Sequence, residues 1–378
     1  MSPSLTCVPG AITARPRCVG RGVGTGRAPP PAFVAGNRGA RPAIPVNEER
    51  FTVNTMRAVR YERFGPPDVL TIDRVPVPDP GPGEVLVRVH AASVGGGETE
   101  IRAGSLRRVM GSRMPRGLGV DFSGRVSGVG PGVDPARVGE EVLGILPHMG
   151  FGSTADFVAV PQERVVAAPA GLDPAGAAAL PASGTTVLTA LVAKARLREG
   201  ERLLVRGASG GVGSTAVQVG RALGAHVTGL AGRRNLDWVR DLGAHEVFDH
   251  RETGPADLGR FDVVLDVVGS EPGAYRRLRA PGGRYLPLAI DPRRPLRSTA
   301  DTLWSAAVDR RRVLPFSNNP SREDLTELVR YVESGRLVPV VDEVFPVERV
   351  REAHRRVEKG GLRGKVVVAM GEDPGPQG

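Results

Sequence analysis

The chain has 378 residues, which is enough for two domains of ordinary size. Its 40% hydrophobic and 24% charged residues are typical of a soluble globular protein, and no run of about eighteen uncharged apolar residues predicts a membrane span. The net charge of +10 does not indicate a nucleic-acid-binding protein, because nearly all the basic residues are arginines scattered among acidic ones. We therefore expect neither nucleic acid nor a membrane as the primary partner.

Cysteine occurs only as Cys7 and Cys18, and neither belongs to a CxxC pair. This excludes a disulfide framework and a structural zinc site built on cysteines. We expect a cytoplasmic location, because such cysteine usage fits a reducing compartment and the sequence has no convincing apolar core of a signal peptide.

Residues 1–47 contain no Asp or Glu, six Arg and a large share of Pro and Gly. Such a segment cannot bury enough apolar surface to offset its ordering entropy, so we predict disorder. Transit peptides are also acid-free and Arg-rich, although the prolines and glycines here would break an amphipathic helix. The alternative that we favour is a start codon assigned too early, with the working protein beginning at Met56. Residues 1–55 are thus interpreted as a disordered extension or a mis-assigned start.

From Met56 the sequence alternates apolar and polar residues over short stretches separated by Pro and Gly, which is typical of β-strands. The clearest stretch is GEVLVRVHAASV, and the others are MRAVRYERFG, VLTIDRVPVP, GVDFSGRVSGVG and STADFVAVP. A helix follows, with Asp173 as its N-cap and Pro174 at its first position. This part of the chain therefore predicts a β domain.

Strands and helices alternate in the next part of the chain. We expect helices at 213–223 and 235–242, and strands at 203–205, 226–230, 245–248, 262–267 and 284–288. This order predicts a doubly wound α/β fold, with a parallel sheet covered by helices on both faces. Near the C-terminus, SREDLTELVRYVESG predicts an amphipathic helix opened by Ser321, and GKVVVAM predicts a strand that returns to the first domain.

The stretch RLLVRGASGGVGSTAVQVGRALG joins the first strand of the α/β part to its first helix. A tight glycine turn at such a junction lets the backbone approach a pyrophosphate, which the free N–H groups and the dipole of the helix N-terminus attract. GASGGVGS is not the strict GxGxxG pattern, so its position between strand and helix carries the evidence. We interpret it as a dinucleotide-binding loop, with an ordinary strand-to-helix turn as the alternative.

The end of the second strand, GLAGRRN, indicates which dinucleotide is bound. An acidic residue about twenty positions past the glycines would bind the ribose 2′-hydroxyl of NAD. Here Arg233 and Arg234 stand in that region instead, and guanidinium groups suit a 2′-phosphate. We therefore predict NADPH rather than NADH as the cofactor. The alternative is that both arginines face solvent.

Several blocks of the sequence resemble one protein family, over residues 56 to about 370. They are PRGLGVDFSGRV, GAAALPASGTTVLTAL, VRGASGGVGSTAVQVGRALGA, LGAHEVFDHRE and RGKVVV, in this order. Together they resemble the medium-chain dehydrogenase/reductase superfamily, specifically its zinc-free quinone oxidoreductase branch of the zeta-crystallin type. The resemblance implies a GroES-like β domain (56–178 with 316–378), a Rossmann domain (179–315), an active site between them, and a possible homodimer.

The same resemblance implies which residues hold the cofactor. The pyrophosphate would be lined by Ser209, Gly210, Gly211, Val212 and Gly213. His250 would lie beside the adenosine ribose, Thr185 and the loop containing Val268 and Gly269 would lie near the nicotinamide, and Lys365 would lie at the inner rim of the cleft. Thr185 as an ordinary helix residue and Lys365 as a strand-end charge are the alternatives.

The resemblance also shows where this chain departs from its relatives. In zinc-containing relatives a ligand Cys would fall at Gly95 and a ligand His at Val120, so we predict no metal site. Gly96, Gly97 and Glu98 continue a run where quinone reductases usually show Asn and Asp, which predicts a wider substrate entrance. No catalytic residue is identified. Glu98 is conceivable as a general acid, and a solvated loop carboxylate is the interpretation that we favour.

These observations predict a zinc-independent, NADPH-dependent oxidoreductase that reduces quinones or α,β-unsaturated carbonyls by hydride transfer. Such a reaction mainly requires that a small-molecule acceptor be held close to the nicotinamide in the right orientation. Two alternatives stay open. One is an alcohol, aldehyde or polyketide enoyl reductase of the same superfamily, and the other is a non-catalytic NADP-binding protein used for sensing or scaffolding.

Overall fold

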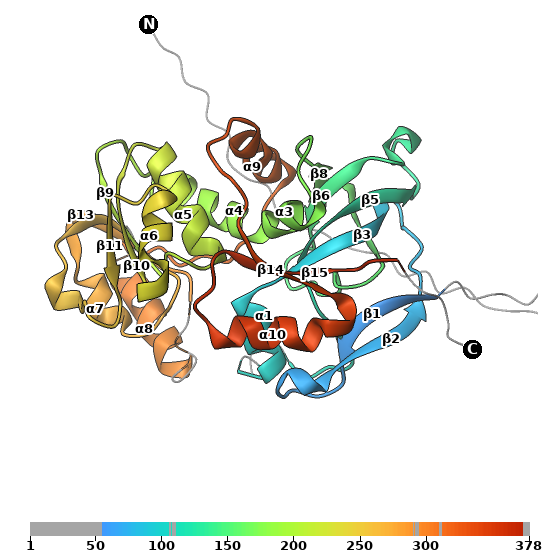
Figure 1. Cartoon of the computed structure of the whole chain (residues 1–378), viewed down its shortest axis with the longest axis horizontal. Helices are drawn as coiled ribbons and strands as arrows, with labels where there is room; N and C mark the ends of the chain where they lie inside the picture. The colour runs from blue at the N-terminus through green and yellow to red at the C-terminus, as the bar shows by residue number, and fades with distance from the viewer. Residues whose placement is uncertain are drawn as a thin grey trace, which may run out of the picture. The chain divides into compact units, whose positions relative to one another are not determined.

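The computed structural model describes residues 55–105, 107, 111–289, 291, 295–309 and 312–372. These described residues belong to one compact unit. The extension expected at 1–55 lies outside the described residues, except for Thr55. Two sheets and a small third one, with their helices, make up the described part (Figure 1).

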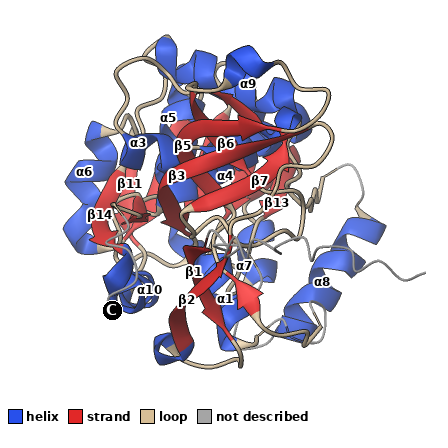
Figure 2. Cartoon of the chain, turned by 90° about the vertical axis from the view of Figure 1, so that its right-hand side faces the viewer, coloured by secondary structure: helices blue, strands red, loops and turns tan. Residues whose placement is uncertain are grey.

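The first sheet has seven strands, of which β3 (Glu84–Val94) is central because it pairs with three others. Along the path β14-β15-β3-β5-β6-β8 all pairs are antiparallel except β14 with β15, and β7 also pairs with β3 (Figure 2). The remaining strands of this sheet are β5 (Asp121–Val129), β6 (Glu141–Ile145), β7 (Phe157–Pro161), β8 (Val165–Ala167), β14 (Val341–Pro346) and β15 (Lys365–Ala369). The pairing of β15 with β3 confirms that the closing strand returns to the first sheet.

A smaller antiparallel sheet contains the first two described strands of the chain. Its order is β2-β1-β4, with β1 (Thr55–Tyr61), β2 (Leu70–Pro76) and β4 (Arg116–Gly117). Strand β1 buries most of its length, with Val59 and Tyr61 both 1% exposed. These two residues belong to the same hydrophobic cluster as the valines of β3, so the small sheet packs on the large one.

The parallel sheet has the order β11-β10-β9-β12-β13, which places the first strand in the middle. Its strands are β9 (Arg202–Arg206), β10 (His226–Ala231), β11 (Glu246–Asp249), β12 (Phe261–Asp266) and β13 (Arg279–Pro287), close to the expected positions. Along β9, Leu203 and Val205 belong to one hydrophobic cluster and Leu204 to another. Both faces of the sheet are therefore covered, as expected of a doubly wound fold.

The helices follow the local signals for helix starts. Asp173 accepts a hydrogen bond from the Gly176 N–H at 2.8 Å, and Ser321 forms a capping box with Asp324, so both expected N-caps are confirmed. The helices are α1 (Gly96–Ala103), α3 (Pro174–Ala179), α4 (Pro181–Val187), α5 (Gly211–Ala222), α6 (Leu236–Asp241), α7 (Pro272–Arg276), α8 (Pro295–Val308), α9 (Arg322–Glu333) and α10 (Val350–Lys359), with a π-helical segment, η4 (Leu188–Lys194), continuing α4.

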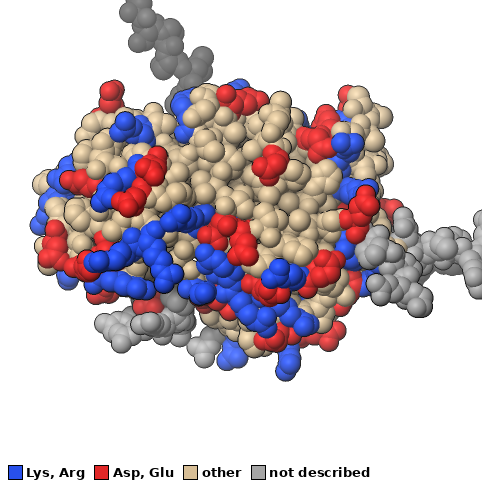
Figure 3. Space-filling model, in the orientation of Figure 1, with Lys and Arg blue, Asp and Glu red and all other residues tan. Residues whose placement is uncertain are grey.

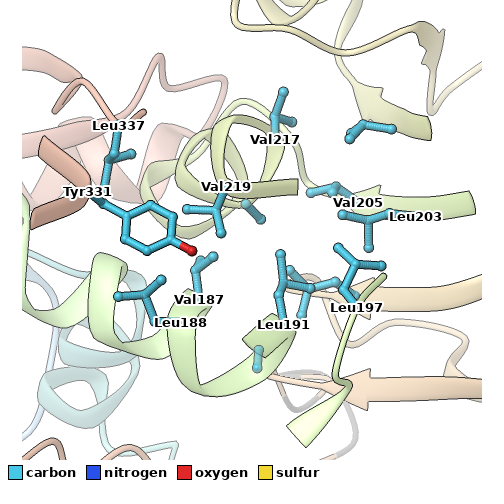
Figure 4. Packing of buried hydrophobic residues seen from close by; sticks show 14 of the residues in the cluster. Val187, Leu188, Leu191, Leu197, Leu203, Val205, Val217, Val219, Tyr331 and Leu337 are labelled. Atoms are coloured by element: carbon cyan, nitrogen blue, oxygen red, sulfur yellow. The ribbon is translucent and has the colours of Figure 1, made fainter. Parts of the chain in front are cut away.

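The largest hydrophobic cluster fixes α5 against the parallel sheet. Val217 and Val219 of α5 lie in one cluster with Leu203 and Val205 of β9, and Val219 lies next to Tyr331 of α9 (Figure 4). All four aliphatic side chains are fully buried, and each such burial contributes about 1.5–3 kcal/mol. This packing fixes α5 against β9, and it thereby fixes the glycine loop that joins them.

Candidate functional site

The glycine loop connects the end of β9 to the start of α5. Gly207 has a φ of 78°, which a residue with a side chain rarely adopts. A Cβ at Gly213 would lie 2.0 Å from the carbonyl oxygen of Gly207, so only glycine lets the helix approach the loop this closely. At Gly210 the nearest atom to a Cβ would be 3.9 Å away, so the outer side of the loop has room. This geometry fits a diphosphate group at the unpaired N–H groups of the first helical turn.

Strand β15 lies directly beside the glycine loop. The Gly364 N–H donates to the carbonyl oxygen of Ser209 at 2.8 Å, and Gly364 forms a bridge with Gly210. The next residue, Lys365, lies over the start of α5, since a Cβ at Gly211 would be 2.7 Å from its Cγ. The structure thus brings Lys365 to the predicted pyrophosphate residues.

The ammonium group of Lys365 points toward a buried carboxylate. Its Nζ lies 3.6 Å from Oδ2 of Asp121, and both side chains are buried. Asp121 also accepts hydrogen bonds from the Ser93 hydroxyl at 2.6 Å and from the Ala182 N–H at 3.2 Å. Asp121 is therefore held as an acceptor on three sides, which explains how a fully buried carboxylate is tolerated.

Glu98 is the residue that the sequence analysis interpreted wrongly. It lies in the first turn of α1 instead of a solvated loop, and it is 5% exposed. Burial raises its pKa to about 8, helped by the charge of Asp121 and opposed by Lys365. The backbone amides of Gly95 and Gly119 also lower the pKa, but neither carboxylate oxygen has a hydrogen-bond partner of normal geometry.

The residues expected at the adenosine end come together after β10 and β11. The Arg233 side chain is 70% exposed, lies 3.6 Å from Asp249 and forms an ion pair with Glu252. The His250 ring lies beside Gly232, with its Cε1 3.6 Å from the point where a Cβ would be. Arg234 is exposed next to Arg233. The sequence analysis missed the two acidic residues, Asp249 and Glu252. Their only signal was their position, since Asp249 is the last residue of β11 and Glu252 lies three residues beyond it.

Polar networks hold the residues that the sequence analysis expected near the nicotinamide. Thr185 is fully buried, donates to the carbonyl oxygen of Pro181 at 2.6 Å and accepts from the Asn318 amide at 2.8 Å. Both hydrogen-bonding roles of this hydroxyl are thus used within the protein. The side chain fixes the start of α4 and ties residue 318 to it.

The loop containing Val268 and Gly269 is held by Asp266, at the end of β12. This fully buried carboxylate accepts both N–H groups of the loop at 3.0 Å. Arg206, at the end of β9, donates to Asp266 at 3.1–3.2 Å and to the hydroxyl of Ser270 at 2.6 Å. The sequence analysis missed this pair, although a polar residue at the carboxyl end of each of two neighbouring buried strands was visible.

The described part of the chain contains neither a candidate metal-ligand cluster nor a candidate membrane-spanning helix. No group of three or more His, Cys, Asp or Glu side chains could hold a metal ion there, and no described helix has the length and apolarity to cross a bilayer. Basic side chains gather over α10 on one face, with acidic ones among them (Figure 3). Arg355 of this helix pairs with Asp68 at 2.6 Å and Arg356 pairs with Asp342 at 2.8 Å.

Comparisons with known proteins agree with this architecture. Residues 81–170 match the family described as alcohol dehydrogenase GroES-like domain, and residues 242–368 match the family described as zinc-binding dehydrogenase. The chloroplast envelope quinone oxidoreductase homolog of Arabidopsis thaliana is 30% identical, over 83% of this chain and 98% of its own length. The mitochondrial NAD(P)H oxidoreductase RTN4IP1 of Danio rerio is 33% identical, over 77% and 85%. The quinone oxidoreductase structure from Coxiella burnetii has a TM-score of 0.75 at 27% identity, covering 84% of this chain and all of that one.

A GroES-like sheet next to a Rossmann-type sheet with a glycine loop defines an oxidoreductase with a nicotinamide cofactor. The chain belongs to the medium-chain dehydrogenase/reductase superfamily and, within it, to the quinone oxidoreductase-like proteins. This confirms the fold and the family that the sequence predicted.

The expected cytoplasmic location is corrected by the same comparisons. The Arabidopsis relative is named as a chloroplast envelope protein and the Danio relative as a mitochondrial one. The cysteine usage that suggested the cytoplasm shows only that the chain lacks a disulfide framework, because Cys7 and Cys18 are its two cysteines, and this does not identify the compartment.

Proposed function

We propose that the protein is a zinc-independent reductase that uses NADPH to reduce quinones or α,β-unsaturated carbonyls. The observation that carries the proposal is the glycine loop beside a buried set of polar side chains, Glu98, Asp121 and Lys365. The loop supports a dinucleotide, and the polar set supports chemistry on a carbonyl compound next to it. The names of the Arabidopsis and Coxiella relatives support quinones as acceptors.

The residues at the metal-ligand positions of the zinc-containing relatives support zinc independence. Gly95 has no side chain and Val120 has an aliphatic one, so neither can donate an electron pair to a metal. A Cβ at Gly95 would lie 3.8 Å from Nζ of Lys365, so the ammonium group of Lys365 lies next to the position of the metal-ligand Cys. A positive charge fixed at this place suits an acceptor oxygen that becomes negative.

Arg233, Arg234 and His250 support NADPH over NADH. A 2′-phosphate would have to compete with Glu252 for Arg233. That ion pair is exposed on both sides, and pairs of this kind contribute less than about 1 kcal/mol. A phosphate can form two charge-assisted hydrogen bonds with a guanidinium group, so the exchange favours the phosphate. His250 would add a donor from the neighbouring strand.

In the proposed mechanism, the glycine loop and the start of α5 hold the diphosphate, with Ser209, Gly210, Gly211, Val212 and Gly213 as its lining. The nicotinamide supplies a hydride when it is bound. The loop with Val268 and Gly269, fixed by Asp266, supports the nicotinamide half from one side. Thr185 positions the start of α4, and Lys365 stabilises the negative charge that develops on the acceptor oxygen.

Equilibrium binding of NADPH and NADH, followed by an NADPH-consumption assay, tests the proposal. We expect saturable binding with at least tenfold preference for NADPH, and oxidation of NADPH with 9,10-phenanthrenequinone or a short enone. Stronger binding of NADH would refute the cofactor assignment. Tight NADPH binding without turnover of any quinone or enone would instead favour a sensing or scaffolding protein, and turnover only with a dedicated alcohol, aldehyde or enoyl substrate would favour the second alternative.

A further inference from the structure

The carboxyl group of Glu98 is buried without a hydrogen bond of normal geometry. Both of its oxygens are inaccessible to solvent, and neither has a partner in such a geometry. A Glu at the third position of a helix commonly accepts the N–H of the N-cap residue; here the amides of Gly95, the N-cap residue, and of Gly119 lie close enough to lower the pKa of Glu98 but do not complete such a bond. Leaving a buried polar group unpaired is costly, so Glu98 does not serve to stabilise α1.

The space that this carboxyl group faces also borders Lys365. A Cβ at Gly95 would lie 3.7 Å from Oε1 of Glu98 and 3.8 Å from Nζ of Lys365. The missing side chain of Gly95 therefore leaves a gap with room for one small group between an acid and an ammonium group. At Gly96 and Gly97 no atom lies within 4 Å of an added Cβ, so there is open space beside the first two residues of α1.

Lys365 connects this gap with the glycine loop. Its Cγ and Cδ lie 2.7 and 2.8 Å from an added Cβ at Gly211, and its Nζ reaches toward Gly95. A single lysine side chain thus spans from the first residue of α5 to the gap beside Glu98. An acceptor in the gap would lie next to a cofactor whose diphosphate is bound at the start of α5.

We propose that Glu98, in its protonated form, is the catalytic residue that donates the proton required by the two-electron reduction; this rests on the proposed reductase function. The acceptor gains two electrons and one hydrogen as a hydride from the reduced nicotinamide, whose C4–H bond breaks. The oxyanion or enolate formed takes the proton of the Glu98 Oε–H group. Oxidised cofactor, reduced acceptor and the Glu98 carboxylate remain, and a proton from water restores the acid once the product has left.

Its two charged neighbours are less suited to this role. Asp121 accepts two hydrogen bonds and forms an ion pair with Lys365, as a carboxylate does. A carboxylate has no proton to donate. Lys365 is the counter-ion of the buried Asp121, so losing its proton would leave that charge uncompensated. Burial raises the pKa of Glu98 to about 8, so it is mainly protonated at neutral pH. Lys365 then stabilises the Glu98 carboxylate once the proton has left.

The test compares the full chain with three variants, E98Q, E98D and the control E333Q, which makes the same chemical change at an exposed position on α9. The first measurement needs no cofactor. Infrared difference spectra between pH 6 and pH 10 should show loss of a carboxylic-acid C=O band in the wild type and in E333Q, and no such band in E98Q. Circular dichroism verifies that each variant is folded.

The second measurement follows the reaction. We expect E98Q to bind NADPH within about twofold of the wild type, while its single-turnover rate with 3-penten-2-one falls about 100-fold or more. The wild-type rate should decline with rising pH above pH 8, E98Q should lack this decline, and E98D should recover part of the rate. If E98Q does not fold, E98D carries the comparison, because its shorter acid should lower the rate at least tenfold and shift the pH profile.

The outcomes separate the two proposals. Two results would overturn the role of Glu98 and leave the reductase function standing. One is an E98Q difference spectrum that still shows the carboxylic-acid band of the wild type. The other is an E98Q rate within threefold of the wild type while NADPH still binds. Absence of saturable binding of NADPH and NADH by the wild-type protein would overturn both.

Discussion

The stability of the protein should depend on pH through Glu98, and replacing Glu98 by Gln should remove this dependence. Its pKa is about 8 in the folded protein, against 4.5 for an ordinary Glu. The carboxyl group is thus protonated more easily in the folded state than in the unfolded state. Below about pH 4.5 both states hold the proton. Between pH 4.5 and 8 the unfolded chain releases it and the folded protein keeps it, so folding stability falls as the pH rises.

The size of this effect follows from the pKa difference. Each pKa unit corresponds to 1.36 kcal/mol, so a shift from 4.5 to about 8 gives about 5 kcal/mol across this pH range. Above pH 8 both states lack the proton, and the loss stays constant. Gln fits the same place and does not titrate. The free energy of unfolding of E98Q minus that of the wild type should therefore rise with pH and level off above about pH 8.

Chemical denaturation with guanidinium chloride, followed by circular dichroism at pH 5, 6, 7, 8 and 9, measures this difference. Other titrating groups contribute equally to both proteins and cancel. The E333Q variant, changed at an exposed site, should track the wild type at every pH. A difference between E98Q and the wild type that stays flat within about 0.5 kcal/mol from pH 5 to pH 8.5 would refute the reasoning, because Glu98 would then titrate like an ordinary exposed acid.

Three further predictions concern the cofactor site and its support. The G213A variant should lose NADPH binding and about 2 kcal/mol or more of stability, because its Cβ would lie 2.0 Å from the Gly207 oxygen. Fluorescence titration and chemical denaturation measure these two effects, and unchanged NADPH binding would contradict the prediction. R233S should raise the Kd for NADPH at least tenfold and that for NADH less than twofold, and equal effects on both would rule out contact with a 2′-phosphate. D266N should cost about 3–5 kcal/mol of stability by leaving Arg206 buried without its counter-charge, whereas the double variant with R206M should cost less.

The parallel sheet could be predicted from the sequence because its signals are local. Strand β9, the glycine loop and α5 follow one another within about two dozen residues, and the apolar runs and glycines mark each boundary. The same holds for the N-caps Asp173 and Ser321, where a side chain bonds an N–H group three residues away. For each N-cap, the interaction that decides the structure lies within one turn of the chain.

The environment of Glu98 could not be predicted in this way. Three glycines before it suggested a loop, since glycine disfavours helix in a sequence taken alone. Helix α1 forms nevertheless, because Thr99 and Arg102 are buried in the folded protein and tertiary packing outweighs the local cost. Likewise Arg206 and Asp266, which form a buried ion pair, are sixty positions apart, and no spacing rule connects them.

The register of β3 with β15 explains why an acid from one part of the chain meets a lysine from another. Val94, the last residue of β3, pairs with Val366, so the next residue outward on β3, Gly95, lies opposite the one before Val366, which is Lys365. The chain then turns into α1 and places Glu98 over the same spot. A one-residue slip in this register would move Lys365 to the other face of the sheet and away from Asp121. The chemistry proposed for Glu98 therefore depends on strand pairing across about 270 residues, which is also why the acid and its partners appear unrelated in the sequence.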